Sequence, residues 1–477
     1  MNAHLTKKWQ ILRPLGLLEN YLAARHQLQF YTNVAVTATY YLPPHSINRS
    51  IKNDIYRACD MLIQHHPVLS VNIVNDRPNS PCFIRLPVID VEQCVVFYAR
   101  RKRASDGFSE DLDVEELLQT QHNTFFEHNN APLWKLCILI DPSLGNTFTA
   151  SFIYHHVIGD GSSGKAFHTT FAQALEQILQ ERPQKTFQPY DSKIGRRKRR
   201  FITPPSSPLL PNLEELMNLP LCASFLIKTF LKAKFCRNSP HLWVGTRKEI
   251  CGPLLNRVQH LALSDTITKA LRKACSANET SVTALLEILI SRSIFRNIDR
   301  KYKLLNYQGS MSGRRWISDK SGVTEDSMGS WVLDYAQKYK RGGLEDRAFP
   351  WHEARKATRY IKKNLAQRDK NRSVGLLKLF SNFADDILLS CVGKPRQTSF
   401  EISNLGVFES QSSLVDIGRM VFSQSSNIAG SAITVNAITG GDESLVLAFT
   451  WQDGVVEAAL VQSIVVDIKK EIYTIFG

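Results

Sequence analysis

Apolar residues along this chain recur with two different spacings, one typical of strands and one typical of helices. Residues 31–41 are rich in Val, Thr and Tyr, which favours a strand, and residues 46–64 then place apolar side chains at helical spacing. A further helix is expected over residues 165–179. Short apolar runs predict more strands at residues 69–74, 82–86, 134–140 and 147–154.

The same mixture of elements returns beyond residue 212. Helical spacing of apolar residues predicts helices at residues 213–235, 265–277, 282–295, 351–364, 374–389 and 461–476. Apolar runs predict strands at residues 258–263, 304–311, 400–402, 433–438 and 445–451. Because both parts of the chain mix strands with helices, we predict an α/β fold built from two mixed β-sheets, each flanked by helices.

A change in composition separates the two parts. Residues 185–211 lack apolar periodicity, contain a basic run at residues 196–200 and end in a Pro/Ser-rich segment, which is typical of a linker. A length of 477 residues also exceeds what one ordinary core accommodates. We therefore expect an N-terminal domain over residues 1–184, a basic linker over 185–212 and a C-terminal domain over 213–477.

The composition is that of a folded protein with a basic surface. The chain is 43% hydrophobic and 22% charged, and its formal net charge is +15. Such a charge attracts nucleic acid, membranes or a small molecule with several phosphates, such as coenzyme A. The basic runs at residues 100–103 and 196–200 lack aromatic interleaving and a recognition fold, so we expect no nucleic-acid partner.

Cysteine usage and apolar run lengths indicate the compartment. The nine cysteines are scattered, with no CxxC pair and no His or Cys cluster at zinc spacing, so we expect reduced thiols and no metal site. No apolar run follows the first residues as in a secretory signal, and none approaches the ~20 residues that span a bilayer. We expect a cytoplasmic monomer without a transmembrane segment.

Residues 219–235 are apolar over much of a helix circumference, with Lys228, Lys232 and Lys234 toward one end. One interpretation is peripheral contact with the endoplasmic reticulum or a lipid droplet. The other is a helix buried against a sheet, with its lysines reaching out to solvent.

The sharpest chemical signal is the segment HHVIGDG at residues 155–161, where an apolar strand ends and a small-residue turn leads into a helix. A histidine at a strand end, such as His156, can project a ring nitrogen into a cleft, while glycines let backbone or substrate come close. With an ordinary pKa of ~6.5, it suits proton abstraction from a hydroxyl that attacks an acyl thioester. Asp160 can reach a fixed cation and lock the turn. The alternative is a His/Asp pair that only caps a strand-to-helix turn.

The chain resembles the fungal alcohol O-acetyltransferase family. This family belongs to the superfamily of chloramphenicol acetyltransferase, plant BAHD acyltransferases and peptide-synthetase condensation domains. The HHxxxDG motif carries the resemblance together with segments at residues 13–16, 19–21, 64–69, 312–314 and 403–406. The late DFGWG motif of the plant enzymes is missing, and residues 436–441 are only a loose substitute, which favours the fungal branch.

The resemblance implies two chloramphenicol-acetyltransferase-like domains with an active-site tunnel between them. It implies that His156 is the general base and that Asp160 forms a structural salt bridge with Arg314. His155 and Gly161 belong to the motif. Ser403 and Asn404 become candidates to face the tetrahedral oxyanion or the pantetheine arm.

The expected activity is acyl-CoA-dependent O-acylation, with acetyl-CoA as co-substrate and no permanently bound cofactor. The acceptor is a small or secondary-metabolite alcohol, and His156 acts in a ternary complex without a covalent acyl-enzyme. One alternative is N-acylation or condensation-type amide formation on an amine. Another is a basic binding protein whose motif is vestigial.

Overall fold

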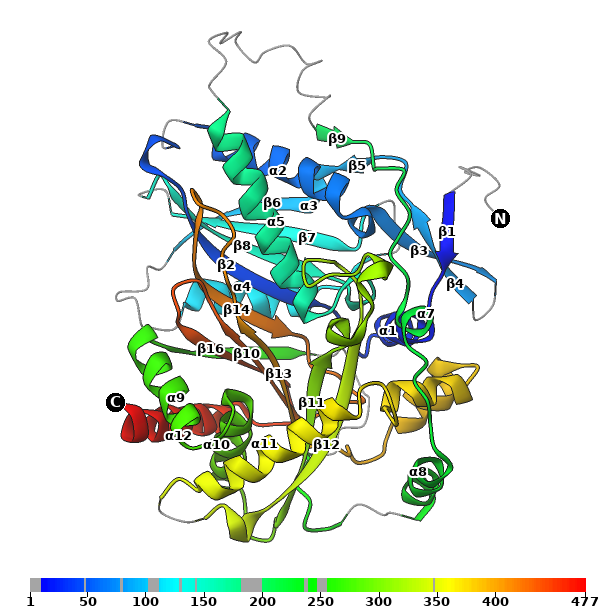
Figure 1. Ribbon diagram of the computed structural model, residues 1–477, viewed down its shortest axis with the longest axis vertical. Helices are drawn as coiled ribbons and strands as arrows, with labels where there is room; N and C mark the ends of the chain where they lie inside the picture. The colour runs from blue at the N-terminus through cyan, green and yellow to red at the C-terminus, as the bar shows by residue number, and fades with distance from the viewer. Residues whose placement is uncertain are drawn as a thin grey trace.

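The computed structural model describes residues 10–46, 49–77, 80–101, 111–127, 131–141, 144–181, 200–235, 239–246, 255–345 and 348–477. Two large β-sheets dominate it, one in the upper half and one in the lower half of Figure 1. The expected α/β class with mixed sheets and flanking helices is therefore confirmed.

The first sheet contains mainly strands from the N-terminal part of the chain. In spatial order they are β14 (Asp416–Gln424), β2 (Val34–Tyr41), β8 (Thr147–Tyr154), β7 (Trp134–Ile140) and β6 (Val95–Ala99). Helices α2 (Ile51–His65) and α5 (Gly161–Gln180) pack with it around one hydrophobic core. Smaller elements nearby are β1 (Gln10–Pro14), β3 (Val71–Arg77), β4 (Ser80–Arg85), α3 (Val91–Cys94) and α4 (Leu112–His122).

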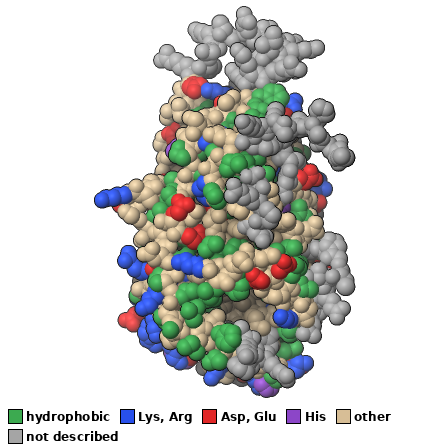
Figure 2. Space-filling view, turned by 90° about the vertical axis from the view of Figure 1, so that its right-hand side faces the viewer, with side chains coloured by type: hydrophobic (Ala, Val, Ile, Leu, Met, Phe, Trp, Pro, Cys, Tyr) green, Lys and Arg blue, Asp and Glu red, His purple; other side chains and the backbone are tan. Residues whose placement is uncertain are grey.

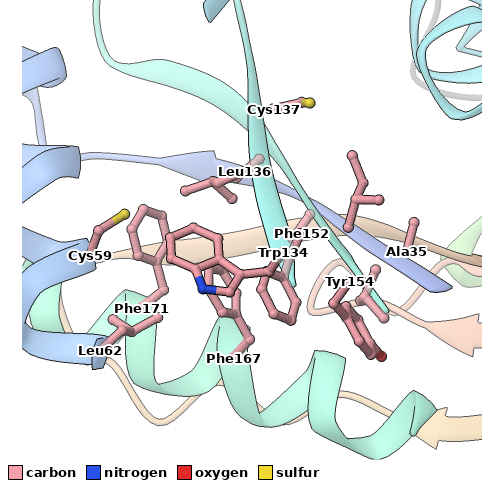
Figure 3. Close-up of a cluster of buried hydrophobic side chains, with 14 of the residues drawn as sticks. Ala35, Cys59, Leu62, Trp134, Leu136, Cys137, Phe152, Tyr154, Phe167 and Phe171 are labelled. Atoms are coloured by element: carbon pink, nitrogen blue, oxygen red, sulfur yellow. The ribbon is translucent and has the colours of Figure 1, made fainter. Parts of the chain in front are cut away.

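Aromatic side chains fill the space between this sheet and helix α5 (Figure 3). The rings of Phe152 and Phe167 stack with their centroids 3.8 Å apart, and Phe171 continues the stack along the helix. Trp134 is buried beside them and donates its indole N–H to the Leu69 carbonyl at 2.8 Å. This packing fixes the strand that leads into the histidine motif.

The second sheet is mixed. Its strands are β10 (Asn256–Leu263), β16 (Leu445–Gln452), β15 (Ile433–Thr439), β13 (Phe400–Val407), β11 (Leu304–Ser312) and β12 (Val332–Lys340). Strand β13 runs parallel to both of its neighbours, and the other pairs are antiparallel. A second core joins the sheet to helices α9 (Asp265–Ala277), α10 (Val282–Asn297), α11 (Trp351–Ala366) and α12 (Ala458–Phe476).

The two halves exchange elements. Strand β14 comes from the C-terminal part of the chain, yet it pairs with β2 at the edge of the first sheet. Helix α1 (Leu17–Gln27) comes from the N-terminal part, yet its Leu18 and Leu22 belong to the second core. A division of the chain at residues 185–212 therefore does not separate the two sheets cleanly, and the domain boundaries stay a prediction.

The described part of the predicted linker crosses both halves. Strand β9 (Phe201–Ile202) pairs with β5 (Ile89–Asp90), and Arg200 forms an ion pair with Asp90 at 2.5 Å. Asn212 then caps α7 (Leu213–Leu216). The rest of the basic run at residues 196–200 lies outside the described residues, as do residues 102 and 103 of the other run.

The prediction of one continuous helix over residues 213–235 is wrong. The segment is split into α7 and α8 (Ala223–Phe235) because Pro220 has no N–H to donate and Leu219 adopts a φ of 45°. The helix expected over residues 374–389 is also wrong, since short helical turns occupy this segment instead: η7 (Ser373–Leu379), η8 (Ala384–Leu388) and η9 (Leu389–Cys391).

Helix α8 exposes apolar side chains. Ile227, Phe230 and Leu231 are 59%, 62% and 47% exposed, so a helix buried against a sheet is the wrong interpretation at these positions. Figure 2 faces the side of the molecule where α8 lies, and apolar side chains gather in the lower part of that face. Within the described residues, no helix is both long enough and apolar enough to span a bilayer.

Candidate active site

The histidine motif is a short turn fixed at both ends. Strand β8 ends at Tyr154, the turn η3 (His156–Ile158) follows, and α5 begins at Gly161. The Tyr154 hydroxyl donates to the Asp160 carbonyl at 2.6 Å, and the Val157 N–H donates to His155 Nδ1 at 3.0 Å. The His156 carbonyl accepts a hydrogen bond from the Ser330 hydroxyl at 2.6 Å, so the other half of the chain also holds the turn.

Gly161 is closely packed. A Cβ at this position would lie 2.6 Å from Leu405 Cδ2 and 2.9 Å from Phe422 Cζ, which is closer than carbon atoms approach without a shift. Leu405 is on β13 and Phe422 is on β14, so the start of α5 lies directly against strands of both sheets. The glycine thus allows the motif to sit where the two halves meet.

Asp160 is buried and bonded to the second half of the chain. Its Oδ2 accepts from Arg314 Nη1 at 2.7 Å and from the Trp331 N–H at 3.0 Å, while Oδ1 accepts from the Ser163 N–H at 3.1 Å and caps α5. Burial acts to raise the pKa of Asp160, but Arg314 and these hydrogen bonds outweigh it and hold the pKa below its ordinary value. The Asp160 carboxylate is therefore ionised, and both of its oxygens are hydrogen-bonded.

A cavity of about 510 Å³ lies between the two halves, and His156 is part of its wall. Helix α1 contributes Tyr21 and Arg25, and the second half contributes Glu401 and Ser403 from β13. Apolar side chains of the turns η7 to η9 complete the wall, among them Leu376, Leu377, Phe380 and Ile387. The cavity therefore reaches the motif histidine from the interface of the two halves.

His156 is in the proton-accepting form at neutral pH. Burial lowers the pKa of His156 to about 4, and the Arg25 guanidinium acts in the same direction. The carbonyls of His156 and Gly159 and the Asp160 carboxylate act to raise this pKa but do not offset the burial. Since Nδ1 is buried while the ring lines the cavity, Nε2 is the nitrogen that can meet a substrate.

Ser403 and Asn404, the two oxyanion or pantetheine candidates on β13, have different surroundings. Ser403 lines the cavity with His156. Asn404 donates from Nδ2 to Thr283 Oγ1 at 3.1 Å and accepts from the Gly406 N–H at 2.9 Å, so its side chain belongs to the opposite face of the strand. The structure thus places Ser403, but not Asn404, in the wall of the cavity that His156 lines.

Sequence reasoning missed most polar residues of the cavity, among them Arg25, Tyr31, Glu401 and Gln424. The Tyr31 hydroxyl donates to Gln424 Oε1 at 2.9 Å, and the Tyr31 ring lies 5.8 Å from that of His156. None of these residues belongs to a motif, and two lie on elements that the apolar pattern did not predict, α1 and β14. Among the described residues, no group of three His, Cys, Asp or Glu side chains is arranged to hold a metal ion.

Solved structures with this two-sheet fold cover almost the whole chain. The trichothecene 15-O-acetyltransferase TRI3 from Fusarium sporotrichioides superposes with a TM-score of 0.67 at 13% identity, covering 98% of this chain and 95% of that one. The first condensation domain of the calcium-dependent antibiotic synthetase gives a TM-score of 0.63 at 11% identity, with 98% and 96% covered. The fold is therefore the two-domain fold of acetyltransferases and condensation domains.

Related sequences show to which family of this fold the chain belongs. The chain is 30% identical over 464 residues to the probable alcohol acetyltransferase crmB of Aspergillus fumigatus, with 93% of this chain and 95% of the relative covered. It is 25% identical over 490 residues to the probable alcohol acetyltransferase FCK4 of Fusarium pseudograminearum, with 95% and 93% covered. The model of the alcohol acetyltransferase family matches residues 14–466, so the chain belongs to the alcohol acetyltransferase family. The class of reaction is acyl transfer to an alcohol.

Proposed function

We propose that this protein transfers an acetyl group from acetyl-CoA to an alcohol, with His156 as general base. The observation that carries the proposal is a histidine with a lowered pKa on the wall of an inter-half cavity, in a turn whose Asp160 is bonded to Arg314. A neutral imidazole with one ring nitrogen facing a cavity is what proton abstraction from a hydroxyl requires.

The reaction then proceeds in two steps. His156 Nε2 takes the hydroxyl proton as the acceptor oxygen forms a C–O bond to the thioester carbonyl carbon, and the carbonyl oxygen becomes an oxyanion. When this intermediate collapses, the C–S bond breaks and the proton on His156 passes to the departing thiolate, which leaves the ester and free coenzyme A. Ser403 is our candidate to donate a hydrogen bond to the oxyanion, because its side chain lines the same cavity.

Direct transfer in a ternary complex is the form of the mechanism that we propose. No hydrogen bond of the described residues joins the His156 ring to a Ser or Cys side chain, whereas nucleophilic catalysis needs such a pair. A stable acyl-enzyme is therefore not part of the proposal.

The acceptor that we propose is a polyfunctional secondary-metabolite alcohol. The cavity of about 510 Å³ falls within the range of sites for drug-sized ligands, and its wall combines apolar side chains with several polar groups, which suits an acceptor with more than one functional group. The name of the fold neighbour TRI3, a trichothecene 15-O-acetyltransferase, agrees with a large acceptor.

Acetyl-CoA turnover against pooled alcohols and amines tests this function. We expect release of coenzyme A and formation of esters with the wild-type chain, and loss of about 10²–10⁴-fold in rate for His156→Ala. His352→Ala is the matched control, since that histidine is 53% exposed on α11. Products formed from amines alone would replace O-acylation by the N-acylation alternative, and no product from any pool would contradict the proposal.

A cytoplasmic location and a monomeric state also stay predictions. Subcellular fractionation tests the location, and light scattering of the purified chain tests the oligomeric state. A stable dimer, or recovery of the protein in a membrane or lipid-droplet fraction, would contradict them.

A further inference from the structure

Arg25 is a fixed cation in the wall of the cavity. It lies in the last turn of α1 and lines the same cavity as His156. Its guanidinium carbon lies 4.5 Å from the ring centroid of Tyr31 and 5.2 Å from that of Tyr21. Contact with two aromatic rings restrains the guanidinium plane and leaves the N–H groups at its edge to meet a ligand.

This guanidinium has no carboxylate partner, unlike several other arginines of the chain. Its Nε is buried without a hydrogen-bond partner, as are those of Arg13 and Arg314, but within the described residues no carboxylate oxygen lies within 4.0 Å of any Arg25 nitrogen. By contrast, Arg13 pairs with Glu19 at 2.7 Å, Arg100 with Asp111 at 2.8 Å and Arg314 with Asp160 at 2.7 Å. A guanidinium in a cavity wall without a carboxylate partner is available to an acceptor that the chain does not supply.

Each carboxyl group of the cavity accepts at least one hydrogen bond from a residue other than Arg25. Glu401 accepts from Thr434 Oγ1 at 3.0 Å and from Gln424 Nε2 at 3.5 Å. Asp334 accepts from Ser373 Oγ at 2.5 Å, and Asp386 from the Asn382 N–H at 3.2 Å. These groups weaken the positive field of Arg25 but leave its N–H groups unpaired, so the cavity can take one anionic group there.

The Tyr31 ring lies between Arg25 and His156, with its centroid 4.5 Å from the Arg25 guanidinium carbon and 5.8 Å from the centroid of the His156 ring. A group bound at Arg25 is therefore within reach of the molecule that meets the base. In the reaction proposed above, the thioester carbonyl must lie at His156, and the whole pantetheine arm separates it from the phosphates of coenzyme A. An anion at Arg25 thus belongs to the acceptor and not to the donor.

Resting on the proposed function, which puts the acceptor hydroxyl at His156, we propose that Arg25 binds a carboxylate of the same acceptor molecule. The substrate is then a hydroxy acid and not a neutral alcohol. A planar guanidinium matches a carboxylate through two parallel hydrogen bonds, which fixes the orientation of the molecule as well as its charge. Arg25 is in this account a specificity-determining residue.

Binding of matched acids and esters tests the proposal without any turnover. The probes are ω-hydroxylaurate, para-hydroxymethylbenzoate and lithocholate, each beside its own methyl ester, titrated calorimetrically into the wild-type chain without acetyl-CoA. We expect at least one acid to bind about 10- to 100-fold more tightly than its ester. Arg25→Met, which keeps an unbranched side chain between the two tyrosines, should abolish this ratio and leave ester binding unchanged.

Two results would overturn the proposal. One is a wild-type protein that prefers none of the acids, and the other is an Arg25→Met protein that loses affinity for acid and ester equally. If Arg25→Met fails to fold, Arg25→Lys replaces it: it should keep a reduced preference for the acid, and an undiminished ratio would count against bidentate binding. His156→Ala should keep the acid preference, so a protein that binds acids but shows no acetyl transfer would refute the proposed function alone.

Discussion

Asp160 and Arg314 are joined across the two halves of the molecule by a buried ion pair of 2.7 Å. Removing one charge leaves the other in a low-dielectric environment, so Asp160→Asn should destabilise the chain by about 3–5 kcal/mol and lower the acetyl-transfer rate. Denaturant unfolding and kcat/KM measure the two effects. In a double-mutant cycle, Asp160→Asn with Arg314→Met should cost less than the sum of the single changes. Additive costs would show that the pair is not coupled.

The pH dependence of kcat/KM should report the lowered pKa of His156. A base whose pKa is lowered to about 4 stays neutral throughout the ordinary range, so its activity should be lost only as the pH falls toward 4. The same shift means that stability tied to the neutral ring is present above the ordinary histidine pKa and is lost as the pH falls through the folded value. An activity limb near ~6.5, with the fold intact by circular dichroism, would contradict this environment.

Gly161→Ala should disturb the contact between α5 and the strands β13 and β14. The added methyl would meet Leu405 and Phe422 at less than 3 Å, which we expect to cost about 1–3 kcal/mol and to lower kcat by displacing the motif. Gly342→Ala is the matched control, because nothing lies within 4 Å of a Cβ there. Equal melting temperatures for the two variants would mean that α5 is not tightly packed at its start.

Ser403→Ala should affect catalysis, whereas Asn404→Ala, at the next residue of the same strand, should affect stability. If Ser403 donates to the oxyanion, its loss should lower kcat by about 10²-fold with little change in KM. Asn404→Ala should instead cost about 1 kcal/mol of stability through the lost bond to Thr283 and leave kcat near the wild-type value. A larger effect on kcat for Asn404→Ala than for Ser403→Ala would reverse the assignment.

The motif region could be predicted because several local signals agree there. An apolar strand, the glycines of the turn and Asp160 as a helix cap all lie within one short stretch of sequence. Arg314 could be reached only through family resemblance, since it lies 154 residues from Asp160 and no local pattern connects the two. Distant pairing of this kind is decided by tertiary packing and not by the spacing of residues along the chain.

Helix α1 and strand β14, which also line the cavity, have no sequence pattern that predicts them. Helix α1 has no clean division between apolar and polar faces, because the cavity is lined by its Leu18 and Leu22, which also enter the second core, and by its charged Arg25. Strand β14 contains Gly418 and Arg419, which interrupt its alternation, and its pairing with β2 depends on the whole fold. Arg25 and Gln424 were therefore missed together with the elements that carry them.

The most direct test of the account is the rate of acetyl transfer by His156→Ala once an acceptor has been found. Single-turnover kinetics with acetyl-CoA and saturating acceptor isolate the chemical step, and thermal unfolding checks that the variant is folded. The account predicts a fall of about 10²–10⁴-fold in this rate, with acceptor affinity unchanged and His352→Ala at the wild-type value. Equal rates for His156→Ala and the wild-type chain would remove His156 from the mechanism.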